Sequence, residues 1–183
     1  YLIQYAGLSL TRGSTDGLWA AEVVNMAVTL LILVKLCALA SERRSSSWLA
    51  LLITFLACGW RVYEGGNFTE EYALPCISLA LLIFYRFFRT GTYRKRNIIL
   101  LGIAFSAVFL LRANMIAVWV ASMPLVLVKF LKEKRFRDLG ICAGLFLLGA
   151  LIAAVPVIIY LFSHHAIESF ADCYIYNVFS VYL

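Results

Sequence analysis

Residues 98–130 read IILLGIAFSAVFLLRANMIAVWVASMPLVLVKF, and this stretch decides the fold. It holds few polar side chains, and it is longer than the roughly 17–25 residues that one membrane-spanning helix needs. The strongest polar interruption is Arg112-Ala113-Asn114, so we expect the chain to turn there. The stretch therefore predicts a hairpin of two transmembrane helices.

Four further apolar segments suit the thickness of a bilayer, and they cover residues 18–40, 48–63, 72–88 and 139–162. The chain is 63% hydrophobic and 14% charged, whereas soluble domains are near 45–50% and 25%. We predict an all-α fold, a polytopic transmembrane helix bundle of about six spans, with residues 1–183 as a single transmembrane domain and a fragment of a larger membrane protein. Helical spacing near the C-terminus also predicts an interfacial amphipathic helix, through Ile167, Phe170, Ala171 and Tyr174.

The basic residues are divided unequally between the two sets of loops. Residues 41–47, 86–96 and 129–138, together with Lys35, hold 13 of the 16 Lys and Arg residues, and seven of the ten acids belong to the other set. Because cytoplasmic loops are enriched in Lys and Arg, we place the basic loops in the cytoplasm and both ends of the chain outside. The same rule explains the net charge of +6, so we predict no nucleic-acid partner.

Arg112 is the most conspicuous charge, because it lies within a long apolar region at or just below the predicted outer surface. A cation inside a membrane costs about 2.5–3.5 kcal/mol at mid-bilayer and usually marks a site or a partner. One interpretation is that its planar guanidinium binds an anionic group such as a lipid phosphate. The other is a turn residue that reaches water or pairs with a carboxylate.

A second polar group lies in the predicted outer loop, where residues 64–71 read EGGNFTEE. Asn67 and Glu70 have the spacing of a helix cap, and acids suit the first turn of a helix. The carboxylates of Glu70 and Glu71 would also suit a divalent cation, which prefers oxygen ligands. We expect Pro75 in the first turn of the third span, where proline is best tolerated.

Glu22 and Asn25 are three residues apart in the outer part of the first predicted span, so they share a helix face. An acid inside a membrane helix usually faces the bundle interior. We expect Glu22 to pair structurally with Arg112 or Arg61, in preference to catalysis.

Other residues give no sign of a metal or nucleotide site. None of the five cysteines forms a C-x-x-C pair, and we predict neither a disulfide nor a metal cluster. His164 and His165 are adjacent, so on a helix they would point about 100° apart and suit one metal poorly. No nucleotide-binding glycine loop, G-x-S-x-G or H-E-x-x-H motif is present.

Two short segments resemble a known family. They are GGNFTEEYALP at residues 65–75 and FLLRANMI at residues 109–116, where relatives often read Arg-Pro-Asn and this chain has Ala113 in place of the proline. Together with the order of spans they resemble bacterial membrane glycosyltransferases of the GT-C superfamily, relatives of the protein mannosyltransferases and of the lipid A aminoarabinose transferase.

The resemblance implies transfer of a sugar from a polyprenyl-phosphate donor to an acceptor at the extracytoplasmic face of the bacterial inner (plasma) membrane, in building the cell envelope. It implies that Arg112 binds the donor phosphate, that Glu70 and Glu71 help shape the outer site, and that the catalytic acid lies in a loop ahead of residue 1. Membrane lipids and the polyprenyl-phosphate sugar would be the partners. The outer-face site candidates are Glu22, Asn25, Glu70, Glu71 and Asn114.

Two rival hypotheses remain open. A transporter or flippase for a lipid-linked sugar or another anionic lipid would also need an outward-facing cation such as Arg112. A non-catalytic membrane scaffold is the third possibility.

Overall fold

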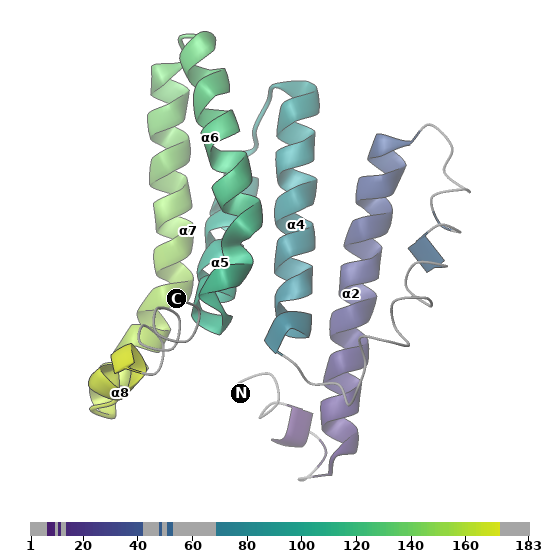
Figure 1. Cartoon of the computed structure of the whole chain (residues 1–183), viewed down its shortest axis with the longest axis vertical. Coiled ribbons are helices and arrows are strands. Elements are labelled where there is room, and N and C mark those ends of the chain that lie inside the picture. The colour runs from purple at the N-terminus through teal and green to yellow at the C-terminus, as the bar shows by residue number, and fades with distance from the viewer. Residues whose placement is uncertain are drawn as a thin grey trace. The chain divides into compact units, whose positions relative to one another are not determined.

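The computed structural model describes residues 7–9, 11, 14–41, 48, 51–52 and 69–172. These residues belong to two compact units, residues 1–92 and residues 93–183, and within the described ranges all regular structure is helical. The first unit contains α2 (Asp16–Ala40) and α4 (Thr69–Thr90). The second contains α5 (Lys95–Leu111), the short 3-10 helix η1 (Ala113–Ile116), α6 (Ala117–Lys132), α7 (Phe136–Ser163) and α8 (Ile167–Ala171) (Figure 1).

Four of the described helical segments are long and apolar enough to cross a membrane: Asp16–Ala40, Glu70–Thr90, Ala113–Lys132 and Phe136–Ser163. Three of them confirm the predicted segments at 18–40, 72–88 and 139–162. The predicted span at 48–63 lies almost entirely outside the described residues. The exposed faces of these helices carry large apolar side chains, among them Leu31, Val120, Leu147, Ile159 and Phe162. Lipid is the solvent that such faces require.

The predicted break in residues 98–130 is confirmed. Helix α5 ends at Leu111, Arg112 is extended with φ −164° and ψ 110°, and η1 follows at once. The backbone N–H of Arg112 still donates to Val108 O at 2.8 Å, and its carbonyl accepts from the Met115 N–H at 3.1 Å. A polar residue therefore interrupts the apolar run without leaving these two backbone groups unbonded.

Helices α2 and α4 of the first unit pack side by side and run parallel (Figure 1). Asn25, in the first half of α2, donates a hydrogen bond to the carbonyl of Glu71, in the first turn of α4. Near their last residues, Tyr85 and Arg89 both donate to the Leu39 carbonyl. Contacts at matching ends fix the direction of the pair.

In the second unit α5 and α7 approach each other at two glycines. A Cβ atom at Gly102 would lie 2.1 Å from Phe146 O, and one at Gly149 would lie 2.1 Å from Ile99 O. Small residues at such positions let two membrane helices approach at backbone distance. Glycine is therefore required at both positions by the packing.

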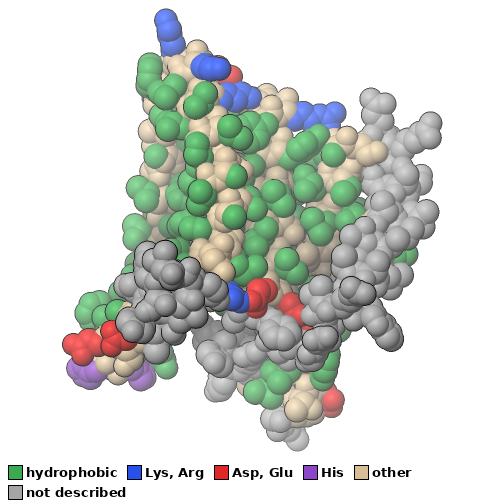
Figure 2. Space-filling model, viewed as in Figure 1, with side chains coloured by type: hydrophobic (Ala, Val, Ile, Leu, Met, Phe, Trp, Pro, Cys, Tyr) green, Lys and Arg blue, Asp and Glu red, His purple; other side chains and the backbone are tan. Residues whose placement is uncertain are grey.

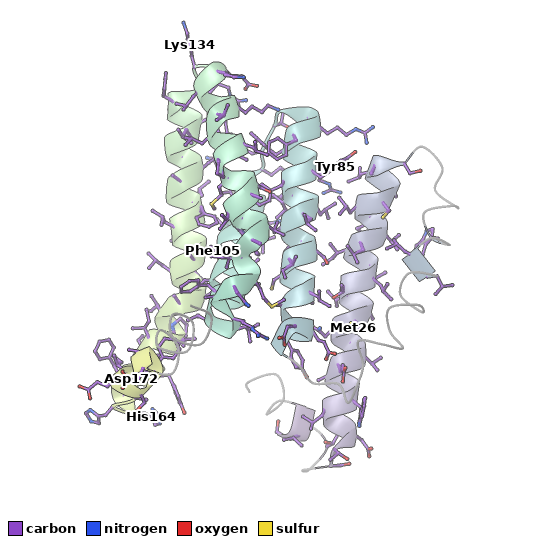
Figure 3. The ribbon with its side chains drawn as sticks, viewed as in Figure 1. Met26, Tyr85, Phe105, Lys134, His164 and Asp172 are labelled. Carbon is purple, nitrogen blue, oxygen red and sulfur yellow. The ribbon has the colours of Figure 1, made fainter. Side chains whose placement is uncertain are left out.

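Aromatic side chains fill the space between α5, α6 and α7 beside this crossing. Phe105, labelled in Figure 3, contacts the rings of Phe109, Trp119 and Phe146, with centroids 5.4–6.0 Å apart. Trp119 is fully buried, and its indole N–H donates to the Leu101 carbonyl at 3.3 Å. The partner satisfies the one polar atom that this large side chain brings into the core.

Polar side chains form a cluster where α5 begins and where α6 connects to α7. Tyr93 donates to Asp138 Oδ1 at 3.1 Å, while Arg135 bonds Asp138 Oδ2 at 2.7–2.8 Å and Glu133 Oε2 at 3.1 Å. The Arg135 guanidinium also lies 5.2 Å from the centre of the Phe130 ring. Partial burial and the hydrogen bond to Asp138 raise the pKa of Tyr93 to about 12, so its phenol remains a neutral donor near pH 7.

The turn between α6 and α7 holds Lys134 in the left-handed region, with φ 56°. The Arg135 N–H donates to Phe130 O and the Lys134 N–H donates to Leu131 O, which is the Schellman pattern of helix ends. Figure 3 shows Lys134 at the tip of this turn, and Figure 2 shows Lys and Arg side chains gathered there. The residue at this position is usually glycine, because an L side chain costs about 1–2 kcal/mol in this conformation.

Replacing Lys134 by glycine should therefore raise the free energy of unfolding by about 0.5–1 kcal/mol. Lys132→Gly is the matched control, because it removes the same charge but lies in the last turn of α6, where glycine costs about 1 kcal/mol. Unfolding in mixed detergent micelles measures both variants. An equal loss of stability in the two would show that the Lys134 backbone conformation carries no strain.

Candidate functional site

Three polar residues of the first unit lie in the first half of α2 and the first turn of α4. Glu22 is 3% exposed and Glu71 is 2% exposed, although both are acids within helices that suit a membrane. Asn25 lies one turn beyond Glu22 on α2 and is partly buried. The helix pair therefore brings together three of the predicted site residues.

Because of Pro75, the backbone of α4 lacks one helical hydrogen bond, and Asn25 supplies a donor in its place. The expectation that Pro75 falls in the first turn is wrong, because α4 begins at Thr69 and Pro75 lies inside the helix. Proline has no N–H, so the carbonyl four residues earlier, that of Glu71, loses its usual helical donor. Asn25 Nδ2 donates to that carbonyl at 2.6 Å. In a membrane, neighbouring helices must satisfy such freed groups because no water can.

The partner of Asn25 is thus a backbone carbonyl. The expected pairing of Glu22 with Arg112 or Arg61 stays a prediction, because Arg61 lies outside the described residues and Arg112 belongs to the second unit.

Glu22 differs from Asn25. Neither of its carboxylate oxygens has a hydrogen-bond partner among the described residues. The buried Tyr72 of α4 is close enough for the charges of Glu22 and Glu71 to act on its phenol. The position of Tyr72 beside both acids was not predicted, because nothing in the local sequence of α4 shows which residue of α2 it faces.

Glu70 and Glu71 lie in the first turn of α4, where acids interact favourably with the helix dipole. Glu71 is buried and Glu70 is half-buried, as expected for neighbours that point about 100° apart on a helix. No group of three or more His, Cys, Asp or Glu side chains with metal-ligand geometry occurs in the part of the chain that the structure describes. A divalent cation at this pair stays a prediction, and Asn67 of the proposed cap lies outside the described residues.

Arg112 and Asn114 belong to the second unit, at the break between α5 and α6. Arg112 is partly buried and Asn114 is exposed. Within this unit, the break lies at the C-terminal end of α5, whereas the basic residues Arg94 and Lys95 lie at its start. Arg112 is thus separated from the other basic side chains of α5 by the full length of the helix.

The two histidines lie at the end of α7. His164 stacks on Tyr160 with ring centroids 4.2 Å apart and contacts Ser163 Oγ at 2.9 Å. His165 has φ 52° and occupies the left-handed position of a second Schellman motif, in which the Ala166 N–H donates to Leu161 O. These contacts give both residues a structural role in ending the helix.

Comparison with protein-family models, with curated proteins and with solved structures gives no match to this chain. The class of protein therefore follows from the fold alone. Four helices long and apolar enough to span a bilayer indicate an integral membrane protein of the helical type.

Proposed function

We propose that this chain is part of a membrane glycosyltransferase that transfers a sugar from a polyprenyl-phosphate donor to an acceptor outside the bacterial inner membrane. The observation that carries the proposal is the position of Arg112 at the break between two apolar helices, far along α5 from the basic residues at its start. The two motifs that resemble GT-C enzymes include this arginine and the acids of α4.

The proposal includes a topology of six spans. Adjacent parallel helices such as α2 and α4 require a connection that returns from the end of the first to the start of the second. A crossing at residues 48–63 would supply that return. With it, Glu22 and Glu71 of the first unit and Arg112 of the second unit all belong to the extracytoplasmic side, as the positive-inside rule predicts.

The chemistry of the reaction matches these residue types. A lipid phosphate leaving group gains negative charge as the sugar departs, and a guanidinium fixed beside it stabilises that charge. An acceptor hydroxyl needs a carboxylate base. Arg112 would bind the phosphate, as the resemblance implies.

The test measures release of free polyprenyl phosphate from a labelled polyprenyl-phosphate sugar by the purified full-length protein. Arg112→Ala should lower release by about 100-fold or more, as loss of one charge-stabilising donor does in other enzymes. Arg137→Ala, an exposed arginine near the start of α7, is the matched control and should leave release unchanged. Thermal unfolding of each variant checks that the loss is not one of folding.

Two outcomes would overturn the assignment. Normal release by Arg112→Ala would remove Arg112 from the site. If the protein moves the labelled lipid across vesicles and releases no polyprenyl phosphate, then the transporter or flippase hypothesis replaces the transferase.

A further inference from the structure

Exposed cations gather in the second unit where α5 begins and where α6 turns into α7. These two places lie side by side, because Tyr93 donates to Asp138 Oδ1 and its ring contacts that of Phe130, with centroids 6.2 Å apart. Figure 2 shows Lys and Arg side chains around the turn that carries Lys134 in Figure 3. We define the basic patch as Arg94, Lys95, Arg96, Lys132 and Lys134, all of which are exposed.

The acids next to the basic patch do not neutralise it. Glu133 and Asp138 both bind Arg135, at 3.1 Å and 2.7 Å. None of the patch side chains forms an ion pair within the part of the chain that the structure describes. Like charges that the fold holds together repel one another, so an anion that binds here would stabilise the folded protein.

Apolar side chains beside the patch indicate what kind of anion would bind. Leu131, next to Lys132 in the last turn of α6, is exposed, and Phe136, the first residue of α7, is 62% exposed. From here α6 and α7 continue as helices suited to a membrane. A phospholipid offers a phosphate to the cations and an acyl chain to these apolar side chains, whereas a soluble anion or a nucleic acid would leave Phe136 in water.

We propose that the basic patch binds the headgroup phosphate of an anionic phospholipid, whose acyl chain packs against Leu131 and Phe136. The positive-inside rule predicts that this end of the unit is cytoplasmic, and the anionic lipids of that leaflet attract basic residues at the ends of membrane helices. Arg112 lies at the other end of α5, so this lipid is not the sugar donor of the proposed transferase.

Native mass spectrometry of the full-length protein in neutral detergent tests the proposal, because it counts the lipids that stay bound. The wild type should bind phosphatidylglycerol more tightly than phosphatidylcholine with the same acyl chains. Arg96→Gln combined with Lys134→Gln should weaken phosphatidylglycerol binding by about 25-fold, since each cation near an anionic surface contributes about fivefold. The matched control combines Lys35→Gln with Arg86→Gln, which removes one exposed lysine and one exposed arginine from the first unit and should leave the affinity unchanged.

Equal affinity for the two lipids, or an equal loss of affinity in the two double variants, would overturn the proposal. Displacement of bound phosphatidylglycerol by inorganic phosphate or by an oligonucleotide at the same concentration would also overturn it, because the patch would then bind a soluble anion.

A second measurement needs no variant. An amine-acylating reagent labels exposed lysines, so bound phosphatidylglycerol should protect Lys95, Lys132 and Lys134 and leave the labelling of Lys35 unchanged, with phosphatidylcholine as the reference. If the double variant fails to accumulate, this labelling decides, and equal acylation of the patch in the two lipids overturns the proposal. Both measurements read lipid binding and not sugar transfer, so this proposal and the proposed function can fail independently.

Discussion

Replacing Gly149 by leucine should force α7 away from α5 and destabilise the second unit by more than about 3 kcal/mol. The first atom of the new side chain would lie 2.1 Å from Ile99 O and 2.9 Å from Ile99 C. These are backbone atoms of a helix, so no rotamer change can relieve the contact. The remaining leucine atoms would then add volume to a helix crossing that has no space for the first one.

Gly144→Leu is the matched control, because an added Cβ at Gly144 meets nothing within 4 Å. Both glycines lie inside α7, so the two substitutions gain the same intrinsic helix propensity, close to 1 kcal/mol. The control should be neutral or slightly stabilising, while Gly149→Leu unfolds at lower denaturant. Similar unfolding curves for the two would show that α5 and α7 do not meet at Gly149.

This pair of glycines also shows how far a sequence predicts packing. Gly140 and Gly144 have the small-xxx-small spacing that favours close helix association, and Gly149 has the same spacing with Ala153. Yet additions at Gly140 and Gly144 meet no described atom within 4 Å, whereas Gly149 contacts α5. Which face of α7 packs against α5 depends on the shape of both helices. The spacing of residues within α7 alone does not predict it.

Other features could be predicted well because they depend on the nearby sequence alone. The break at Arg112 was predictable, since a charged residue within 33 mainly apolar residues leaves few alternatives. The first span was also predicted closely, as residues 18–40 against the observed Asp16–Ala40. Length and polarity set both features.

The candidate site was predicted less completely. Glu22, Asn25 and Glu71 were predicted to be outer-face residues, and Asn25 does contact the backbone of Glu71, although their position on the outer face stays a prediction. Their contacts were not predicted, because Pro75 was expected in the first turn of α4. Only when proline lies deeper in the helix does the Glu71 carbonyl need a donor from another helix.

Replacing Asn25 by leucine should destabilise the first unit by about 1–2 kcal/mol, because it leaves the Glu71 carbonyl without the donor at 2.6 Å. The loss of stability caused by Asn25→Leu should be smaller in a Pro75→Ala background. Alanine restores the N–H at position 75, which can donate to the Glu71 carbonyl within α4 and make the Asn25 amide redundant. The double-mutant cycle should thus yield a coupling of about 1 kcal/mol between two residues on different helices.

The cycle is controlled by repeating Asn25→Leu in a Pro156→Ala background. Pro156 lies inside α7 of the other unit, so its replacement cannot supply a donor to Glu71. There the cost of Asn25→Leu should equal the cost in the wild type, since distant sites are additive within about 0.5 kcal/mol. If the cost is the same in all three backgrounds, then Asn25 stabilises the helix pair through something other than the carbonyl that Pro75 frees. A reduced cost with Pro75→Ala alone would show that Asn25 acts as the donor to the carbonyl that Pro75 frees.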